Sequence, residues 1–167
     1  MFTSFTKTEE SILTLFSLYV LIGQAHNVVD SNKDILNAEV KSTQDFEGIS
    51  NSTIKEALIH QILLNSCSFV DEWNKVFSSK ANSEHHDIVV NVKKICKPAW
   101  DYIDSWKELR VFRNHFIAHN FRNDKNKSVF LNPQSYHSPR SHEELSLLVL
   151  AMEKMMNSRL FLPGSNC

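Results

Sequence analysis

The residues best suited to chemistry lie in the stretch 109–122, which reads Leu-Arg-Val-Phe-Arg-Asn-His-Phe-Ile-Ala-His-Asn-Phe-Arg. In it Arg113 and Asn114 are followed by an apolar turn and then by Ala118 and His119. An arginine binds non-bridging phosphate oxygens through a rigid fork that keeps its charge. A histidine can take and give a proton near neutral pH. The stretch therefore indicates metal-free cleavage of a phosphodiester.

Basic residues gather around this stretch, although the whole chain has a net charge of −1. From position 107 to position 127 there are six basic and two acidic residues, which leaves a local charge of +4. The net charge excludes a general polyanion binder, but the local excess suits contacts with phosphates. The alternative reading of such a cluster is the solvated end of a helix.

The spacing of the arginine and the histidine is weak evidence when taken alone. Arg110 and His115 match a similar pattern within the same stretch. Residues six apart on a regular helix point about 120° away from each other, so Arg113 and His119 do not share one helix face. Either the helix frays before His119, or two copies of the motif complete the site across a two-fold axis. This geometry favours a dimeric site.

Composition predicts an all-α fold. Hydrophobic residues make up 42% of the 167 residues, charged residues 22%, and there are only three glycines and four prolines. These hydrophobic and charged fractions are typical of globular proteins, and glycine and proline are scarcer than the many turns of a sandwich or barrel need. We predict one domain over 1–167, a four- to five-helix bundle with mostly antiparallel helices.

Apolar periodicity and capping patterns place the helices. Helices are expected over 7–27, 53–77, 84–95, from Pro98 to about 120, and over 142–160, with a short helix and a linker around Gly48 within 28–50. Within the helix that begins at Pro98, Ser105 could start a fresh helix or interrupt the existing one. The capping boxes are Thr6/Glu9, Thr53/Glu56, Ser105/Glu108 and Ser141/Glu144. The expected core faces are Ile12, Leu15, Phe16, Tyr19 and Ile22 in the first helix, and Ile54, Leu58, Ile62, Phe69, Trp73 and Phe77 in the second. A loop is expected at about 121–140, which is long enough to suggest a function.

The N-terminal apolar run and the cysteines indicate the cellular compartment of the protein. The run 12–22 follows Glu9 and Glu10, where a signal peptide would be basic, and it is too short to span a bilayer. We expect a core-facing helix and no membrane association. The cysteines, Cys67, Cys96 and Cys167, are odd in number and show no metal spacing, and Cys67 lies in an apolar run. A reduced, cytoplasmic protein is expected.

The segment Arg-Asn-His-Phe-Ile-Ala-His resembles the signature of the HEPN superfamily, small α-helical proteins with an Arg-polar-x(3–5)-His motif. It looks most like the abortive-infection-type branch, where Ala-His commonly ends the motif. The resemblance is specific over about 15 residues. Across the remaining chain it consists only of the order of the helices. A toxin branch of the superfamily has a tyrosine two places after the histidine, where this chain has Phe121, so another branch is expected.

The resemblance implies a metal-independent endoribonuclease of a host-defence or toxin system, with its cleft between two protomers. It places Arg113, Asn114 and His119 at the three signature positions and implies no cofactor. Its expected partners are RNA, a second copy of the chain, and an antitoxin or another defence protein. Residues expected to bind the RNA backbone are Arg110, His115, Arg122, Lys125 and Lys127.

Other readings stay open. The chain could be a catalytically silent helical domain of the same fold that binds a partner protein or nucleic acid. Arg113 could instead pair with an acidic residue, with His119 capping a helix. His115 and His119 lie four apart and could hold a metal from one helix face. The cluster 84–87 (Glu-His-His-Asp) also suggests a metal, but adjacent helical residues diverge, so a solvated helix start is expected there.

Overall fold

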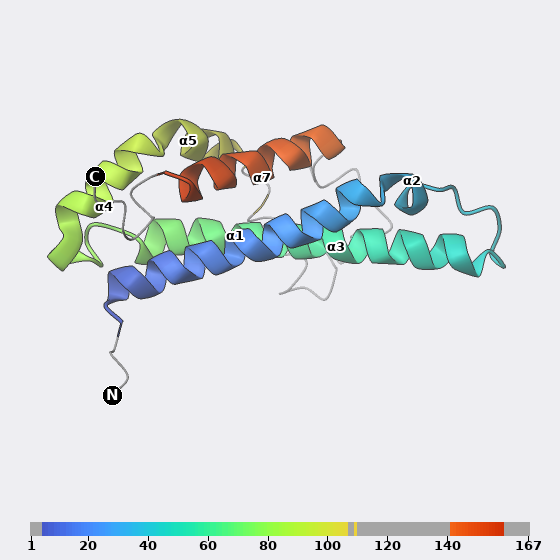
Figure 1. Ribbon diagram of the computed structural model, residues 1–167, viewed down its shortest axis with the longest axis horizontal. Helices are drawn as coiled ribbons and strands as arrows, with labels where there is room; N and C mark the ends of the chain where they lie inside the picture. The colour runs from blue at the N-terminus through green and yellow to red at the C-terminus, as the bar shows by residue number, and fades with distance from the viewer. Residues whose placement is uncertain (1–4, 107–108, 110–140, 159–167) are drawn as a thin grey trace, which may run out of the picture.

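The computed structural model describes residues 5–106, 109 and 141–158, and every regular element in these ranges is helical (Figure 1). The all-α prediction is confirmed. The elements are α1 (Lys7–Ser31), α2 (Lys33–Leu36), α3 (Phe46–Asp71), a π-helical turn η1 (Glu72–Val76), a 3-10 turn η2 (Ser83–His85), α4 (His86–Ile95), α5 (Lys97–Ser105) and α7 (His142–Met156).

The two long helices, α1 and α3, run side by side in opposite directions along the long axis of the molecule (Figure 1). Helix α7 packs on both α1 and α5, and α4 packs on α5. The short α2 turns the chain back from α1 onto α3. The chain therefore forms a bundle in which α1 contacts most of the other elements.

Two of the predicted capping boxes are confirmed as helix starts. The Thr6 hydroxyl accepts the backbone N–H of Glu9, while the Glu9 carboxylate accepts the backbone N–H of Thr6. The hydroxyl of Ser141 accepts the N–H of Glu144 at 3.2 Å and starts α7. Each contact satisfies an N–H group that has no partner inside the helix.

The capping box predicted at Thr53 is wrong as a helix start, because α3 begins about two turns earlier, at Phe46. The Asp45 carboxylate accepts the Gly48 N–H at 3.0 Å and caps the helix there. Gly48 lies in this first turn and not in a linker, and a Cβ at this position would collide with the Asp45 side chain. Thr53 lies inside the helix, with its hydroxyl donating to the carbonyl of Ile49.

The predicted helix between Pro98 and the motif is shorter than expected. Pro98 lies in the first turn of α5, as predicted. Helix α5 ends at Ser105, whose hydroxyl donates to the Tyr102 carbonyl, and Trp106 lies outside a regular helix. The partner of Ser105 in the predicted capping box, Glu108, lies outside the described residues. Similarly, α7 ends at Met156, before the predicted 160.

The core forms where α1, α3, α5 and α7 meet. Most of the predicted core side chains are buried or half-buried, but Phe16 and Ile54 are exposed, at 52% and 48%. Both belong to apolar runs, yet only one side of each helix faces the bundle. The fully buried side chains that fill the interior include Leu15, Ile22, Ile62, Phe69, Trp73, Phe77, Leu148, Met152 and Met155.

The burial of Ile62 and the exposure of Ile54 on the same helix give a matched test of this packing. We expect Ile62→Ala to lower the free energy of unfolding by about 2–5 kcal/mol, because the bundle cannot close the cavity. Ile54→Ala should change it by less than about 0.5 kcal/mol. Urea denaturation followed by circular dichroism measures both. Equal losses for the two variants would contradict the register of α3.

Candidate functional site

The residues predicted to form the active site lie outside the described part of the chain. These are the catalytic set Arg113, Asn114 and His119 and the RNA-binding set Arg110, His115, Arg122, Lys125 and Lys127. The structure does describe the two points at which the bundle holds this segment, Leu109 before it and Ser141 after it. The geometry of these two points is therefore what the structure contributes to the site.

The segment begins at a buried contact with α3. Leu109 is 4% exposed and packs with Leu63 and Cys67, and the half-buried Ile59 and Trp106 surround this small cluster. The Cys67 thiol donates to the Leu109 carbonyl at 2.8 Å. Cys67 is thus a core residue, as predicted, and it also binds backbone at the start of the motif segment. A buried carbonyl without such a donor would be costly.

The segment ends at a polar contact with α1. Directly after the cap residue of α7, the His142 ring nitrogen Nε2 lies 2.9 Å from the Asp30 carboxylate. The His142 ring stacks on the His26 ring at a centroid distance of 5.4 Å and an angle of 10°. This contact links the first turn of α7 to the C-terminal end of α1.

His26 also binds α7 through a hydrogen bond. Its Nε2 lies 2.9 Å from the Ser146 hydroxyl, and that hydroxyl donates to the His142 carbonyl. Because the hydroxyl proton is used in this way, Nε2–H of His26 is the donor to Ser146 Oγ. Burial lowers the pKa of His26, and neighbouring His142 lowers it further, against an opposing effect of Asp30. His26 therefore favours its neutral form.

Sequence reasoning missed this histidine cluster. His26 lies on α1 and His142 on α7. The two lie 116 positions apart, so no local pattern could join them. Only the packing of α7 on α1 brings them together. His60 on α3 is half-buried, and burial lowers its pKa against the opposing effect of Glu56.

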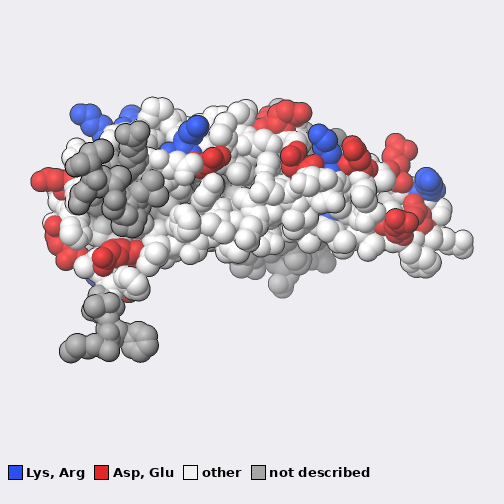
Figure 2. Space-filling view, viewed as in Figure 1, with Lys and Arg blue, Asp and Glu red and all other residues white. Residues whose placement is uncertain are grey.

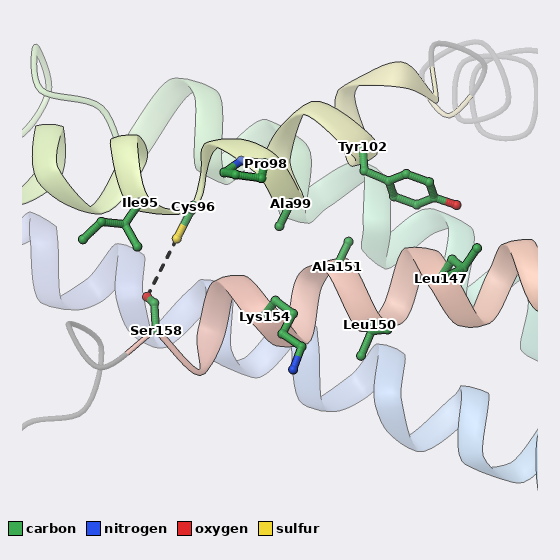
Figure 3. Close-up of a pocket in the computed structure, with 10 residues that line it drawn as sticks. All are labelled: Ile95, Cys96, Pro98, Ala99, Tyr102, Leu147, Leu150, Ala151, Lys154 and Ser158. Carbon is green, nitrogen blue, oxygen red and sulfur yellow. Dashed lines mark hydrogen bonds between the residues drawn. The ribbon is translucent and has the colours of Figure 1, made fainter.

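A second feature is an apolar cavity of about 420 Å³ between α5 and α7 (Figure 3). The Cys96 thiol lies inside it, 3.8 Å from the Ser158 hydroxyl and 3.8 Å from the Met155 carbonyl. Burial raises the pKa of this thiol, so it stays protonated and is a poor nucleophile. The lining is otherwise mostly apolar: Ile95, Pro98, Ala99, Tyr102, Leu147, Leu150, Ala151 and Lys154.

The acidic and histidine residues at 84–87 form the solvated helix start that was expected. Glu84, His86 and Asp87 are exposed and His85 is half-buried, across η2 and the first turn of α4. Within 5–106 and 141–158, no three side chains of His, Cys, Asp or Glu come close enough together to hold a metal. The alternative metal pair His115 and His119 lies outside the described ranges.

No protein-family model, no curated protein and no solved structure matches this chain. The HEPN resemblance therefore stays a prediction from the motif.

The two histidines with lowered pKa values, His26 and His60, predict how stability depends on pH. The unfolded chain binds more protons than the folded chain once the pH falls below the ordinary histidine pKa of about 6.5. The stability they contribute is therefore present at neutral pH, and is lost as the pH falls through the lowered pKa values. We expect the free energy of unfolding to decrease from about pH 7.5 to about pH 5.5.

The variant His26→Gln should weaken this pH dependence, while Asn27→Gln, a change at an exposed neighbour on α1, should leave it as in the wild type. Urea denaturation at several pH values measures the slopes. A slope unchanged by His26→Gln would show that the pKa of His26 is not lowered by folding as described.

Proposed function

We propose that this chain is a HEPN-like, metal-independent endoribonuclease of a host-defence or toxin system. The observation on which the proposal depends is the motif Arg113-Asn114 with Ala118-His119 in a chain whose described elements are all helical. The anchoring of the motif segment at Leu109 and at Ser141 supports it. A segment fixed at both ends on a packed bundle can hold catalytic groups more precisely than a free tail can.

The proposed reaction uses the ribose 2′-hydroxyl as the nucleophile. His119 takes the proton of this hydroxyl while its oxygen attacks the adjacent phosphorus. The bond from phosphorus to the 5′ oxygen then breaks, and that oxygen leaves with a proton from an imidazolium or from water. The products are a 2′,3′-cyclic phosphate end and a 5′-hydroxyl end. RNA is the substrate because DNA lacks the internal nucleophile.

Arg113 would stabilise the negative charge that develops on the phosphate oxygens, because a fixed cation acts where charge forms in the transition state. Asn114 would hold the phosphate or orient the histidine ring. Since Arg113 and His119 do not share one face of a regular helix, we place each working site between two copies of the chain. The basic residues around the motif would bind the RNA backbone on either side of the cut.

The test is cleavage of a 5′-labelled single-stranded RNA by purified protein in EDTA. We expect His119→Ala and Arg113→Ala each to lower the cleavage rate by about 10²–10⁴-fold, as is typical when a proton-transfer group or a charge-stabilising donor is removed. His86→Ala, a change at an exposed histidine on α4, is the matched control and should retain the rate. The product should have a 2′,3′-cyclic phosphate, and RNA with 2′-O-methyl riboses should resist cleavage.

Two results would contradict the proposal. Cleavage that persists in His119→Ala would exclude the assigned site. Cleavage that EDTA abolishes would indicate the histidine-based metal site instead. RNA that binds without being cut under any of these conditions would support the silent helical domain.

A further inference from the structure

Helix α3 has a second apolar stripe beside the one that it contributes to the main core. Ile59, Leu63 and Cys67 follow one another at four-residue steps, so their side chains share one face of the helix. Leu63 and Cys67 are 2% and 1% exposed, and Ile59 is half-buried. The main-core residues of α3, such as Ile62 and Phe69, belong to a separate cluster. This second stripe is therefore buried by another part of the chain.

Leu109 covers the second stripe and is held there in three ways. Its side chain, 4% exposed, packs on Leu63 and Cys67. Its backbone N–H donates to the Trp106 carbonyl at 3.1 Å, and its carbonyl accepts the Cys67 thiol at 2.8 Å. Both backbone polar groups of Leu109 thus have hydrogen-bond partners. The direction of the chain at Leu109 is fixed as well as its position.

The bond from Cys67 is the one that ties this direction to the bundle. Apolar packing has no directional preference, so the Leu109 side chain alone would tolerate rotation of the backbone. The bond to Trp106 spans only three residues and moves with its own turn. The thiol is on α3, 42 positions away in the sequence, and a hydrogen bond requires a defined angle at the carbonyl. It therefore orients the peptide group that leads into the motif segment.

The chain length between Leu109 and the motif limits how far this control reaches. Arg113 is four residues beyond Leu109, so the two Cα atoms lie within about 14 Å of each other in any conformation of the chain. His119 is ten residues beyond, which allows up to about 36 Å. The orientation of Leu109 therefore restricts Arg113 much more closely than His119.

The charges of the bundle make the direction of this segment important. Figure 2 shows Lys and Arg side chains scattered over the visible face of the bundle, several of them beside Asp or Glu. Lys75 is paired with Asp71, and Lys97 with Asp101. Among the described residues of the visible face, no continuous basic surface is present to bind an RNA backbone. The phosphate contacts of the proposed function therefore depend on the basic residues that follow Leu109.

We propose that Cys67 is a positioning residue for the motif: its thiol holds the Leu109 carbonyl and so sets the direction in which the chain continues toward Arg113. The inference rests on the proposed ribonuclease function and deepens it, because it names a group that controls the same site without touching RNA. A cysteine suits this place, since it is apolar enough to be buried and still has a weak S–H donor.

The alternative role for Cys67 is to fill space in the core, and Cys96 provides the matched comparison. Cys96 is also buried, at 3% exposure, but its thiol lies 3.8 Å from the Met155 carbonyl on α7. A change from cysteine to valine alters the side-chain volume similarly at both positions. Only at Cys67 does the change remove a short hydrogen bond to the start of the motif segment.

The first test is the rate of amide hydrogen exchange at Leu109, followed by NMR in the full chain. Cys67→Val should raise this rate about tenfold, because the unpaired carbonyl makes local opening of the turn more frequent. The N–H of Leu15 in the core of α1 is the internal reference and should not change. Cys67→Ser, which keeps a donor, should restore slow exchange at Leu109. Cys96→Val should match the wild type there.

The second test is the cleavage of single-stranded RNA in EDTA by the same variants. Cys67→Val should lower kcat about tenfold and change KM by less than about threefold, because a displaced Arg113 loses stabilisation of the transition state. Cys67→Ser should recover most of the wild-type kcat, and Cys96→Val should retain it. If Cys67→Val folds poorly by circular dichroism, Cys67→Ala removes the donor without adding volume and gives the same comparison.

Three results would overturn the inference. Leu109 exchange that is equal in Cys67→Val and Cys96→Val would show that the thiol does not fix the backbone. Failure of Cys67→Ser to restore either property would assign Cys67 to filling space. Faster exchange at Leu109 with an unchanged kcat would show that its orientation does not control the site. Wild-type protein that cuts no RNA would contradict the proposed function instead, and the exchange rates would still decide whether Cys67 fixes Leu109.

Discussion

The antiparallel packing of α1 on α3 is the contact on which the other helices depend. Helix α7 lies on α1, α5 on α7 and α4 on α5. The motif segment is attached at one end to α3, through Leu109, and at the other to α1, through His142 and Asp30. The relative position of α1 and α3 therefore sets the distance that the segment must bridge. A substitution that shifts α1 against α3 would move the two attachment points of the segment.

Polar groups on the buried side of α1 fix this pair in one register. The Thr8 hydroxyl donates to the Asn82 side chain at 2.9 Å inside the protein, and the Ser11 hydroxyl binds the Glu72 carboxylate. Asn82 in turn donates to the carbonyls of Val76 and Ser78, so the turn after α3 is held by the start of α1. A shift of α1 by one turn would leave these buried groups without hydrogen-bond partners. The wrong register is therefore more unfavourable than it would be if α1 were held by apolar packing alone. The helix thus buries polar groups where it meets the start of the turn after α3, and exposes apolar side chains on its other side.

The sequence predicts the helices well, but it predicts less well which helix faces are buried and which distant residues come into contact. The caps at Thr6 and Ser141 were predictable because each depends on residues three apart. The exposure of Phe16 was not, because it depends on which side of α1 meets the bundle. The histidine cluster of α1 and α7 depends on contacts between distant positions, and no local pattern encodes such contacts. For the candidate active site, the sequence supplied the chemistry of Arg113 and His119, and the structure supplied the anchoring points of their segment.

The central claim is that Arg113 and His119 act together across two copies of the chain. Mixing Arg113→Ala protein with His119→Ala protein tests it most directly, with the wild type cutting the same RNA in parallel. Each variant alone should be inactive. Random mixing makes half of the dimers mixed, and each mixed dimer regains one intact site out of two, so the mixture should recover about a quarter of the wild-type rate. A mixture that stays as inactive as its components would contradict a site shared between chains.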